Sequence, residues 1–83
     1  MISLTVRYFA STREQVGQSS ERIELTAPFT VAHLLEELTA RHPSLAALTR
    51  HLRVAVSHEF VADSAALLRD DDEVALIPPV SGG

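Results

Sequence analysis

The 83-residue sequence contains no cysteine and no lysine, and its seven basic residues are all arginine. Without cysteine the chain has no disulfide, no thiolate metal site and no sulfur nucleophile of its own, so another protein must bring any sulfur that it handles. Without lysine the chain has no side-chain amine to which its own C-terminus could be joined. Only Met1 offers an amine.

Basic clusters and long apolar runs are also missing. The formal net charge is −4, which argues against nucleic acid and anionic membranes as partners, because both require arrays of basic side chains. No apolar run is long enough to cross a membrane, and the start MISLTVRYF lacks the basic lead and long apolar segment of a secretory signal. We therefore expect a cytoplasmic protein that binds neither nucleic acid nor a membrane.

Apolar residues make up 46% of the sequence, enough for one small folded domain. Alternating apolar residues predict strands in which every second side chain faces the core. Phe9 falls on the opposite face, where it is either a contact for a partner or covered by the following loop. The last predicted strand is apolar from position 74 to 77, as expected at the centre of a sheet. The predicted strands are residues 2–9, 22–26, 53–57, 60–61 and 73–78.

Leucine spacing predicts one main helix. Thr30 is a good N-cap, and apolar residues follow it at positions 31, 34, 35 and 38, the spacing of one buried stripe. The proline at position 43 ends this helix near Arg41. Residues 44–52 repeat the spacing and form either a short second helix or a looser connection. Residues 10–18 predict a helical turn that ends at Gly17.

The order of these elements is strand, strand, helix, strand, short strand, strand. It predicts an α+β fold in which a mixed sheet curls around one main helix. This is the pattern of the β-grasp, or ubiquitin-like, fold, with the first and last strands as parallel neighbours at the centre of the sheet. Residues 1–77 would form this domain, and residues 78–83 a flexible C-terminal tail.

The tail begins with two prolines and ends on a diglycine. Pro78 and Pro79 stop the last strand and limit the conformations of the tail. Gly82 and Gly83 lack a Cβ, so they can enter a channel too narrow for other residues. Six extended residues span at most roughly 20 Å, enough to carry the terminal carboxylate into a partner's active site. A frayed end is the alternative, but this order of residues favours an end that other proteins act on.

The side chains do not form a convincing catalytic or metal site. The four histidines are nine, nine and seven residues apart, so no two share a helix face, and we expect all four on the surface. Residues 70–72 lack the spaced oxygens and the glycine of a calcium loop, so we expect a solvated turn anchored by Leu67 and Leu68. Ser81 is not at a glycine-bracketed strand-to-helix turn. By elimination, the chemistry belongs at the terminal carboxylate.

Three stretches resemble the MoaD-type small subunits of molybdopterin synthase, a family of ubiquitin-like sulfur carriers in the ThiS/MoaD superfamily. They are RYFASTREQVG near the start, VAHLLEELTARHP in the helix and DDDEVALIPPVSGG at the end, of which the last is the most specific. The likeness covers essentially the whole chain. Two positions depart from the family pattern, since Asp71 stands where glycine is common and Ser57 where asparagine is frequent. The first difference would alter a turn and the second a local hydrogen bond.

The resemblance implies a function in molybdenum cofactor biosynthesis. An E1-like, MoeB-type enzyme would use ATP to adenylate the Gly83 carboxyl, and a persulfide donor would convert the adenylate to a thiocarboxylate. A large MoaE-type subunit would supply the catalytic groups of a heterotetrameric synthase and pass the sulfur to cyclic pyranopterin monophosphate, which yields molybdopterin. The chain itself would bind no cofactor and no metal. Whether the small subunit alone counts as an enzyme stays open.

Carried over by position, the resemblance makes Gly83 the activated residue and Gly82 the residue that gives the tail clearance. The other residues that it implies would contact the partner proteins. They are Phe9, Arg13, Ile77, Pro78, Pro79, Val80 and Ser81.

Two alternatives stay open. The same activation could serve a carrier for thiamine, cysteine or tRNA thiolation, or a modifier that is joined to lysines of other proteins. The chain could also be a β-grasp interaction module whose diglycine is incidental. Such a module would keep its function without Gly83, because a chain end contributes little to the core.

Overall fold

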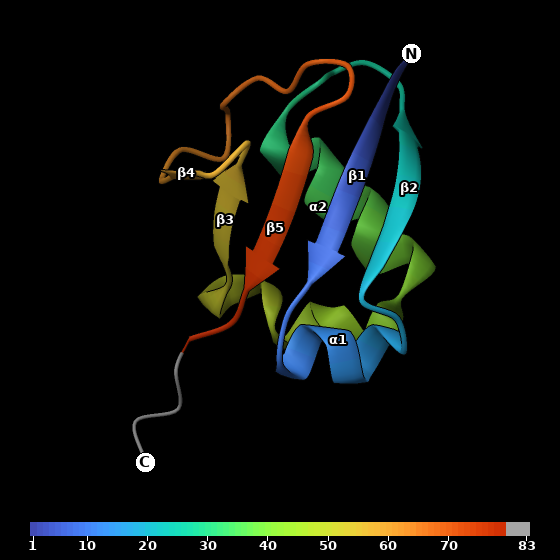
Figure 1. Cartoon of the computed structure of the whole chain (residues 1–83), viewed down its shortest axis with the longest axis vertical. Helices are drawn as coiled ribbons and strands as arrows, with labels where there is room; N and C mark the ends of the chain where they lie inside the picture. The colour runs from blue at the N-terminus through green and yellow to red at the C-terminus, as the bar shows by residue number, and fades with distance from the viewer. Residues whose placement is uncertain (80–83) are drawn as a thin grey trace.

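The computed structural model describes residues 1–79 (Figure 1). Within these residues, no helix reaches the length and apolar character of a membrane span. The strands are β1 (Ile2–Tyr8), β2 (Ser20–Leu25), β3 (Arg53–Val56), β4 (Glu59–Val61) and β5 (Glu73–Ile77). The helices are α1 (Ser11–Val16), α2 (Val31–Arg41) and two short 3-10 helices, η1 (Pro43–Ala47) and η2 (Thr49–His51).

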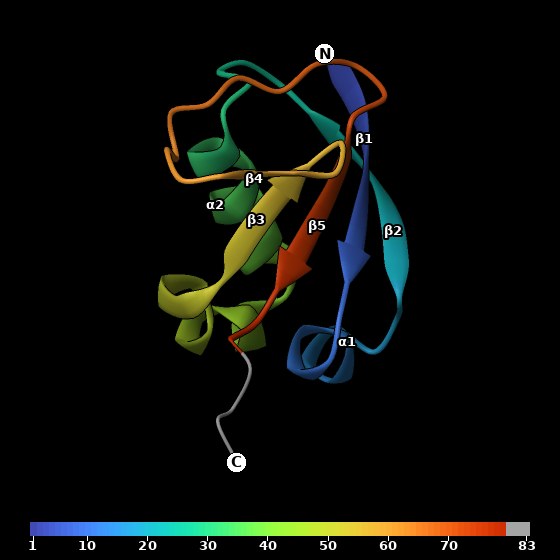
Figure 2. The same cartoon turned by 60° about the vertical axis from the view of Figure 1, so that its left-hand side comes forward.

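The five strands form one mixed sheet in the order β2-β1-β5-β3-β4. β1 and β5 are parallel, with Val6 opposite Val74 and Tyr8 opposite Leu76, and the other neighbours are antiparallel. Figures 1 and 2 show β1 and β5 side by side with α2 across one face of the sheet. The predicted β-grasp fold is confirmed, including the parallel pair at its centre.

The core lies between this sheet and α2. Three of the four predicted helix positions, Val31, Leu34 and Leu38, are buried, while Leu35 is only partly buried. Burying a side chain of this size stabilises the folded state by about 1.5–3 kcal/mol. The strands contribute alternate residues, as the pattern predicted. The buried strand residues of the core are Leu4, Val6, Tyr8, Ile23, Leu25, Val54, Val74 and Leu76.

The ends of the helices follow the predicted capping. The Thr30 hydroxyl oxygen accepts a hydrogen bond from the His33 backbone N–H at 3.1 Å, and α2 ends at Arg41. Gly17 follows α1 with a φ of 86°, a conformation that glycine adopts without the cost of a Cβ clash. The segment predicted as a short helix or a looser connection, residues 44–52, contains most of η1 and all of η2, and Leu45 of η1 is buried in the core.

Leu67 and the first residue of β2 differ from the sequence expectations. Leu67 is 75% exposed, so only Leu68 anchors the segment before the acidic turn. The segment is locally extended, because Thr30 forms an isolated antiparallel bridge with Leu67, and successive side chains of an extended chain point in opposite directions. In addition, β2 begins at Ser20 rather than at position 22, since Ser20 still pairs with Arg7 of β1.

Two turns at one end of the sheet contain residues in the left-handed region. Ser57 and His58, with φ of 48° and 72°, connect β3 to β4, and a two-residue hairpin of this kind needs positive φ at both positions. Asp71, in the acidic turn, has a φ of 67°. The Ser57 hydroxyl donates to Asp72 Oδ1 at 2.9 Å, and Arg22 Nη2 binds Asp71 Oδ1 at 2.5 Å. These bonds hold backbone angles that are strained for residues with a Cβ.

A polar cluster ties several elements together at the opposite end of the sheet. Glu21 Oε2 accepts hydrogen bonds from the Tyr8 hydroxyl at 2.6 Å and from Gln18 Nε2 at 3.1 Å, and His42 Nε2 lies 2.6 Å from the same oxygen. Burial, reinforced by the bond to the Glu21 carboxylate, raises the pKa of Tyr8 above its ordinary value, so the hydroxyl stays a donor. The cluster joins the end of β1, the start of β2 and the residue after α2.

Replacing Glu21 by alanine should lower the free energy of unfolding by about 1–3 kcal/mol, because the buried Tyr8 hydroxyl loses its acceptor. Urea denaturation followed by circular dichroism measures this difference. Glu24→Ala is the matched control, since Glu24 is an exposed carboxylate of the same strand and should change stability by less than about 0.5 kcal/mol. Equal losses in the two variants would show that the cluster does not stabilise the fold.

Candidate functional site

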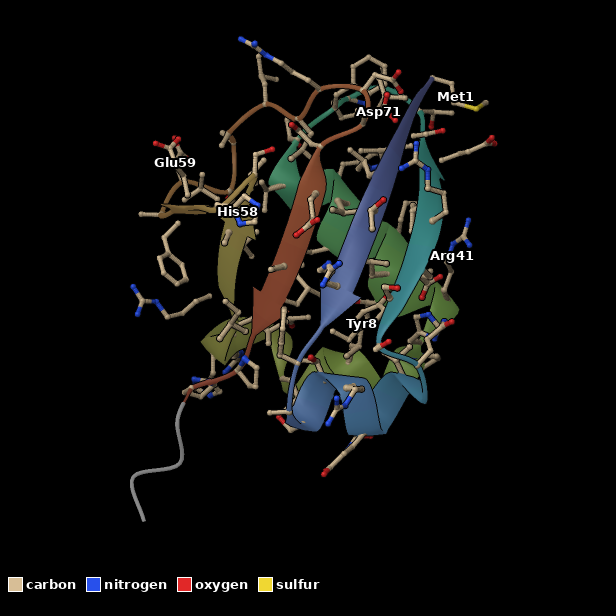
Figure 3. All side chains as sticks on the ribbon, viewed as in Figure 1. Met1, Tyr8, Arg41, His58, Glu59 and Asp71 are labelled. Atoms are coloured by element: carbon tan, nitrogen blue, oxygen red, sulfur yellow. The ribbon has the colours of Figure 1, made fainter. Side chains whose placement is uncertain are left out.

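The face of the sheet opposite α2 carries a shallow hollow beside the end of β5. It has a volume of about 330 Å³. Since Val74 and Leu76 point into the core, Ala75 and Ile77 point to this opposite face. Figure 3 shows His58, in the turn between β3 and β4, directed toward β5. The residues that line the hollow are Arg7, Phe9, Ala55, His58, Phe60, Glu73, Ala75 and Ile77.

The central parallel pair brings Phe9 and Ile77 together at this hollow. Tyr8 is opposite Leu76, so the next residue along each chain, Phe9 and Ile77, lies at the same level of the sheet. Phe9 is 42% exposed and is therefore not covered by the loop that comes after it. Its backbone N–H donates to the Thr12 hydroxyl at 2.8 Å, which fixes the direction of the chain after β1.

Charged side chains surround the apolar floor of the hollow. Arg7 Nε lies 3.3 Å from Glu73 Oε1, an exposed pair that contributes little to stability. The Arg53 guanidinium lies 4.3 Å from the centre of the Phe60 ring, a cation–π geometry. Phe60 itself is 56% exposed. An exposed apolar patch with a charged rim is typical of a surface that binds another protein.

The other predicted contact residues are spread around this end of the molecule. Arg13 is exposed on α1 and does not line the hollow. Pro78 is buried against the domain, and Pro79 is exposed. The predicted site residues Val80, Ser81, Gly82 and Gly83 lie outside the described residues.

Sequence reasoning missed several lining residues of the hollow. Ala55 and Ala75 are small, so their positions on strands gave no signal beyond the alternation of faces. Phe60 was predicted only as part of a short strand, although an aromatic residue on an edge strand is a recognisable signal of an exposed contact. His58 was predicted to lie on the surface, which the structure confirms.

The prediction that all four histidines lie on the surface is wrong for two of them. The side chains of His33 and His42 are only 21% and 20% exposed, and they lie beside Glu36 and Glu21 respectively. His33 lies in the first turn of α2 and His42 directly follows the helix, and both are partly buried, whereas His51 and His58 are exposed. Residues 1–79 contain no group of three or more histidine, aspartate and glutamate side chains that could hold a metal ion.

Comparison with known proteins gives relatives along the whole chain. The human molybdopterin synthase sulfur carrier subunit is 36% identical over 85 residues, which cover 100% of this chain and 97% of the relative. The protein of the same name from Chlamydomonas reinhardtii is also 36% identical, over 99% of this chain and 100% of the relative. The crystal structure of SAMP1, a small archaeal modifier protein of Haloferax volcanii, superposes with a TM-score of 0.85 at 30% identity, over 98% of this chain and 99% of that one.

A protein family matches most of the chain. Residues 6–83 match the ThiS family, and this range includes β5 with the end of β1, the residues of the hollow and the diglycine. The chain therefore belongs to the ThiS family.

Proposed function

We propose that this chain is the sulfur carrier subunit of a molybdopterin synthase. The observation that carries the proposal is the end-to-end match with two relatives of that name, each at 36% identity. The match includes the diglycine, the part of the chain that the chemistry requires. In this function the folded domain binds partners, and the Gly83 carboxyl carries the sulfur.

Activation of the carboxyl explains why a second protein and ATP are needed. A carboxylate is a poor electrophile, so an E1-like adenylating enzyme joins the Gly83 carboxylate to the α-phosphate of ATP and releases pyrophosphate. The terminal sulfur of a persulfide then attacks the carbonyl carbon, and AMP leaves with the electron pair of the C–O bond. A thiol cleaves the resulting acyl disulfide and leaves the thiocarboxylate. Such covalent activation divides one difficult transfer into easier steps.

The hollow supports a docking role for the face opposite α2. Ile77 both lines the hollow and ends β5, so the chain leaves the domain at the edge of this surface. Six residues, 78–83, extend at most roughly 20 Å. A large synthase subunit that covers Phe9, Phe60 and Ile77 would therefore hold the Gly83 thiocarboxylate within reach of its own active site. That subunit would supply the acid and base groups for sulfur transfer to cyclic pyranopterin monophosphate.

A second candidate function is that of a protein modifier. It is favoured by the likeness to SAMP1 of Haloferax volcanii, at 30% identity and a TM-score of 0.85. The two functions share the activated Gly83 carboxyl and differ in the acceptor, which is a sulfur atom for the carrier and an amine of another protein for the modifier. The shared name of the human and algal relatives favours the carrier.

Incubation with the E1-like enzyme, ATP and a persulfide donor should raise the intact mass of the chain by about 16 Da, the difference between sulfur and oxygen in a thiocarboxylate. Fragmentation should place the gain on Gly83. A chain without Gly83 should show no gain, although it should unfold at the same urea concentration as the full chain. An unchanged mass of the full chain, under conditions that activate an established carrier, would refute the proposal.

Replacing Phe9 by alanine should weaken binding to the large subunit by roughly 2 kcal/mol, or about thirty-fold in Kd, the effect of truncating an aromatic residue at the centre of an interface. Isothermal titration calorimetry measures the affinity. Leu67→Ala is the control, because Leu67 is also an exposed apolar side chain but does not line the hollow. It should bind like the unmodified chain, and an equal loss in both variants would argue against docking at the hollow.

A further inference from the structure

The surface of the domain displays cations that are not nucleophiles. All seven arginines are at least partly exposed: Arg7, Arg13, Arg22, Arg41, Arg50, Arg53 and Arg69. A guanidinium stays protonated at any physiological pH and does not attack acyl groups, whereas the ε-amine of lysine is the usual acceptor of ubiquitin-type conjugation. A lysine in place of any of these arginines would thus offer an accessible amine as the acceptor of an acyl group.

Other side chains do not replace the missing amine, and the N-acyl imidazole that an exposed histidine, His51 or His58, could form is an intermediate that water hydrolyses. The sequence has no thiol, and serine and threonine hydroxyls are weak nucleophiles unless a base activates them. The one phenol, Tyr8, is 1% exposed, and its hydroxyl donates a hydrogen bond to Glu21 Oε2 at 2.6 Å. The Tyr8 oxygen is therefore neither accessible nor ionised.

The N-terminal amine of Met1 is the one amine of the chain, and it lies beyond the reach of the C-terminus of the same chain. Met1 is 76% exposed and precedes β1, and Figure 3 shows it at the end of the sheet away from Tyr8. β1 has seven residues and spans about 23 Å at roughly 3.3 Å per residue. β5 ends level with the far end of β1, and the six residues after Ile77 extend at most roughly 20 Å. The Gly83 carbonyl therefore falls short of the Met1 amine.

We infer that this chain is an acyl donor whose own side chains are not acceptors, so that an activated Gly83 carboxyl is preserved for a nucleophile of a partner. The inference rests on the proposed function, because it concerns the activated carboxyl. The reaction that the lack of lysine prevents is aminolysis, the attack of a side-chain amine on the activated Gly83 carboxyl. In that reaction an amine nitrogen bonds to the Gly83 carbonyl carbon, the leaving group departs with the electron pair of its bond to carbon, and the amine proton passes to water.

A Gly83 thioester, made by intein cleavage on a chain acetylated at Met1, tests the inference without an adenylating enzyme. At high protein concentration and mildly alkaline pH, the thioester of the unmodified sequence should hydrolyse without forming covalent dimers. Arg50→Lys and Arg69→Lys keep the charge and lie outside the hollow. Each should form about tenfold more covalent dimer, since an amine replaces a guanidinium. Intact mass spectrometry and peptide mapping measure the product.

Free lysine added to each sample shows that the thioester is reactive. Side-chain-linked dimers of the unmodified sequence would overturn the inference, and so would lysine variants that form no more dimer than the unmodified chain. Neither result depends on the E1-like enzyme. Failure of the inference is thus separate from failure of the proposed function, which the absence of the mass gain at Gly83 would show.

Discussion

The parallel pairing of β1 with β5 is the interaction on which the rest of the structure depends. It places the two ends of the domain sequence at the centre of one sheet, so Val6, Val74 and Leu76 meet over α2 in the core. The same pairing sets Phe9 beside Ile77 on the opposite face. A shift of this register by one residue would exchange the buried and exposed sides of β5. The buried core and the hollow on the opposite face of the sheet therefore both depend on the register between β1 and β5.

The register also explains how a domain without catalytic side chains can serve chemistry at its chain end. β5 has strands on both sides, which makes it a rigid support for the last residues of the chain. The chain leaves β5 beside a hollow whose floor is apolar and whose rim is charged. In the proposed function, partners bind the hollow, and the position of the last residues is set by that docking. Because all seven basic side chains are arginine, the chain has no lysine amine that could compete with a partner for the activated Gly83 carboxyl.

Much of the fold was predictable from periodicity. The alternation in β1 and the leucine stripe of α2 each predicted the buried side, and the order of the elements predicted the β-grasp arrangement. The uniformly apolar β5 was predicted only to lie at the centre of the sheet, and its alternating burial came from the structure. Contacts between residues far apart in sequence were beyond such reasoning. The burial of His42 depends on Glu21 and Tyr8, which lie on two other elements. The hollow likewise combines residues from four strands or their ends. Small residues such as Ala55 give no clear signal in a pattern of apolar side chains.

The two departures from the family pattern, Ser57 and Asp71, share one backbone conformation. Ser57 and Asp71 both have positive φ, the conformation that asparagine and glycine tolerate best. In this chain each has a side-chain hydrogen bond: the Ser57 hydroxyl donates to Asp72, and the Asp71 carboxylate accepts from Arg22. Side-chain contacts thus hold both turns in this chain. Both lie at the end of the sheet away from the tail, so they leave the end of β5 unchanged.

In the proposed function, the domain delivers sulfur from Gly83 to a pterin through a docked large subunit. Reconstitution tests it most directly: the thiocarboxylated chain is mixed with a large synthase subunit and cyclic pyranopterin monophosphate, and molybdopterin is measured by fluorescence of its oxidised derivative. We expect molybdopterin to form while the mass of the chain returns to that of the carboxylate. An unchanged thiocarboxylate and no molybdopterin, in conditions where an established carrier yields product, would contradict it.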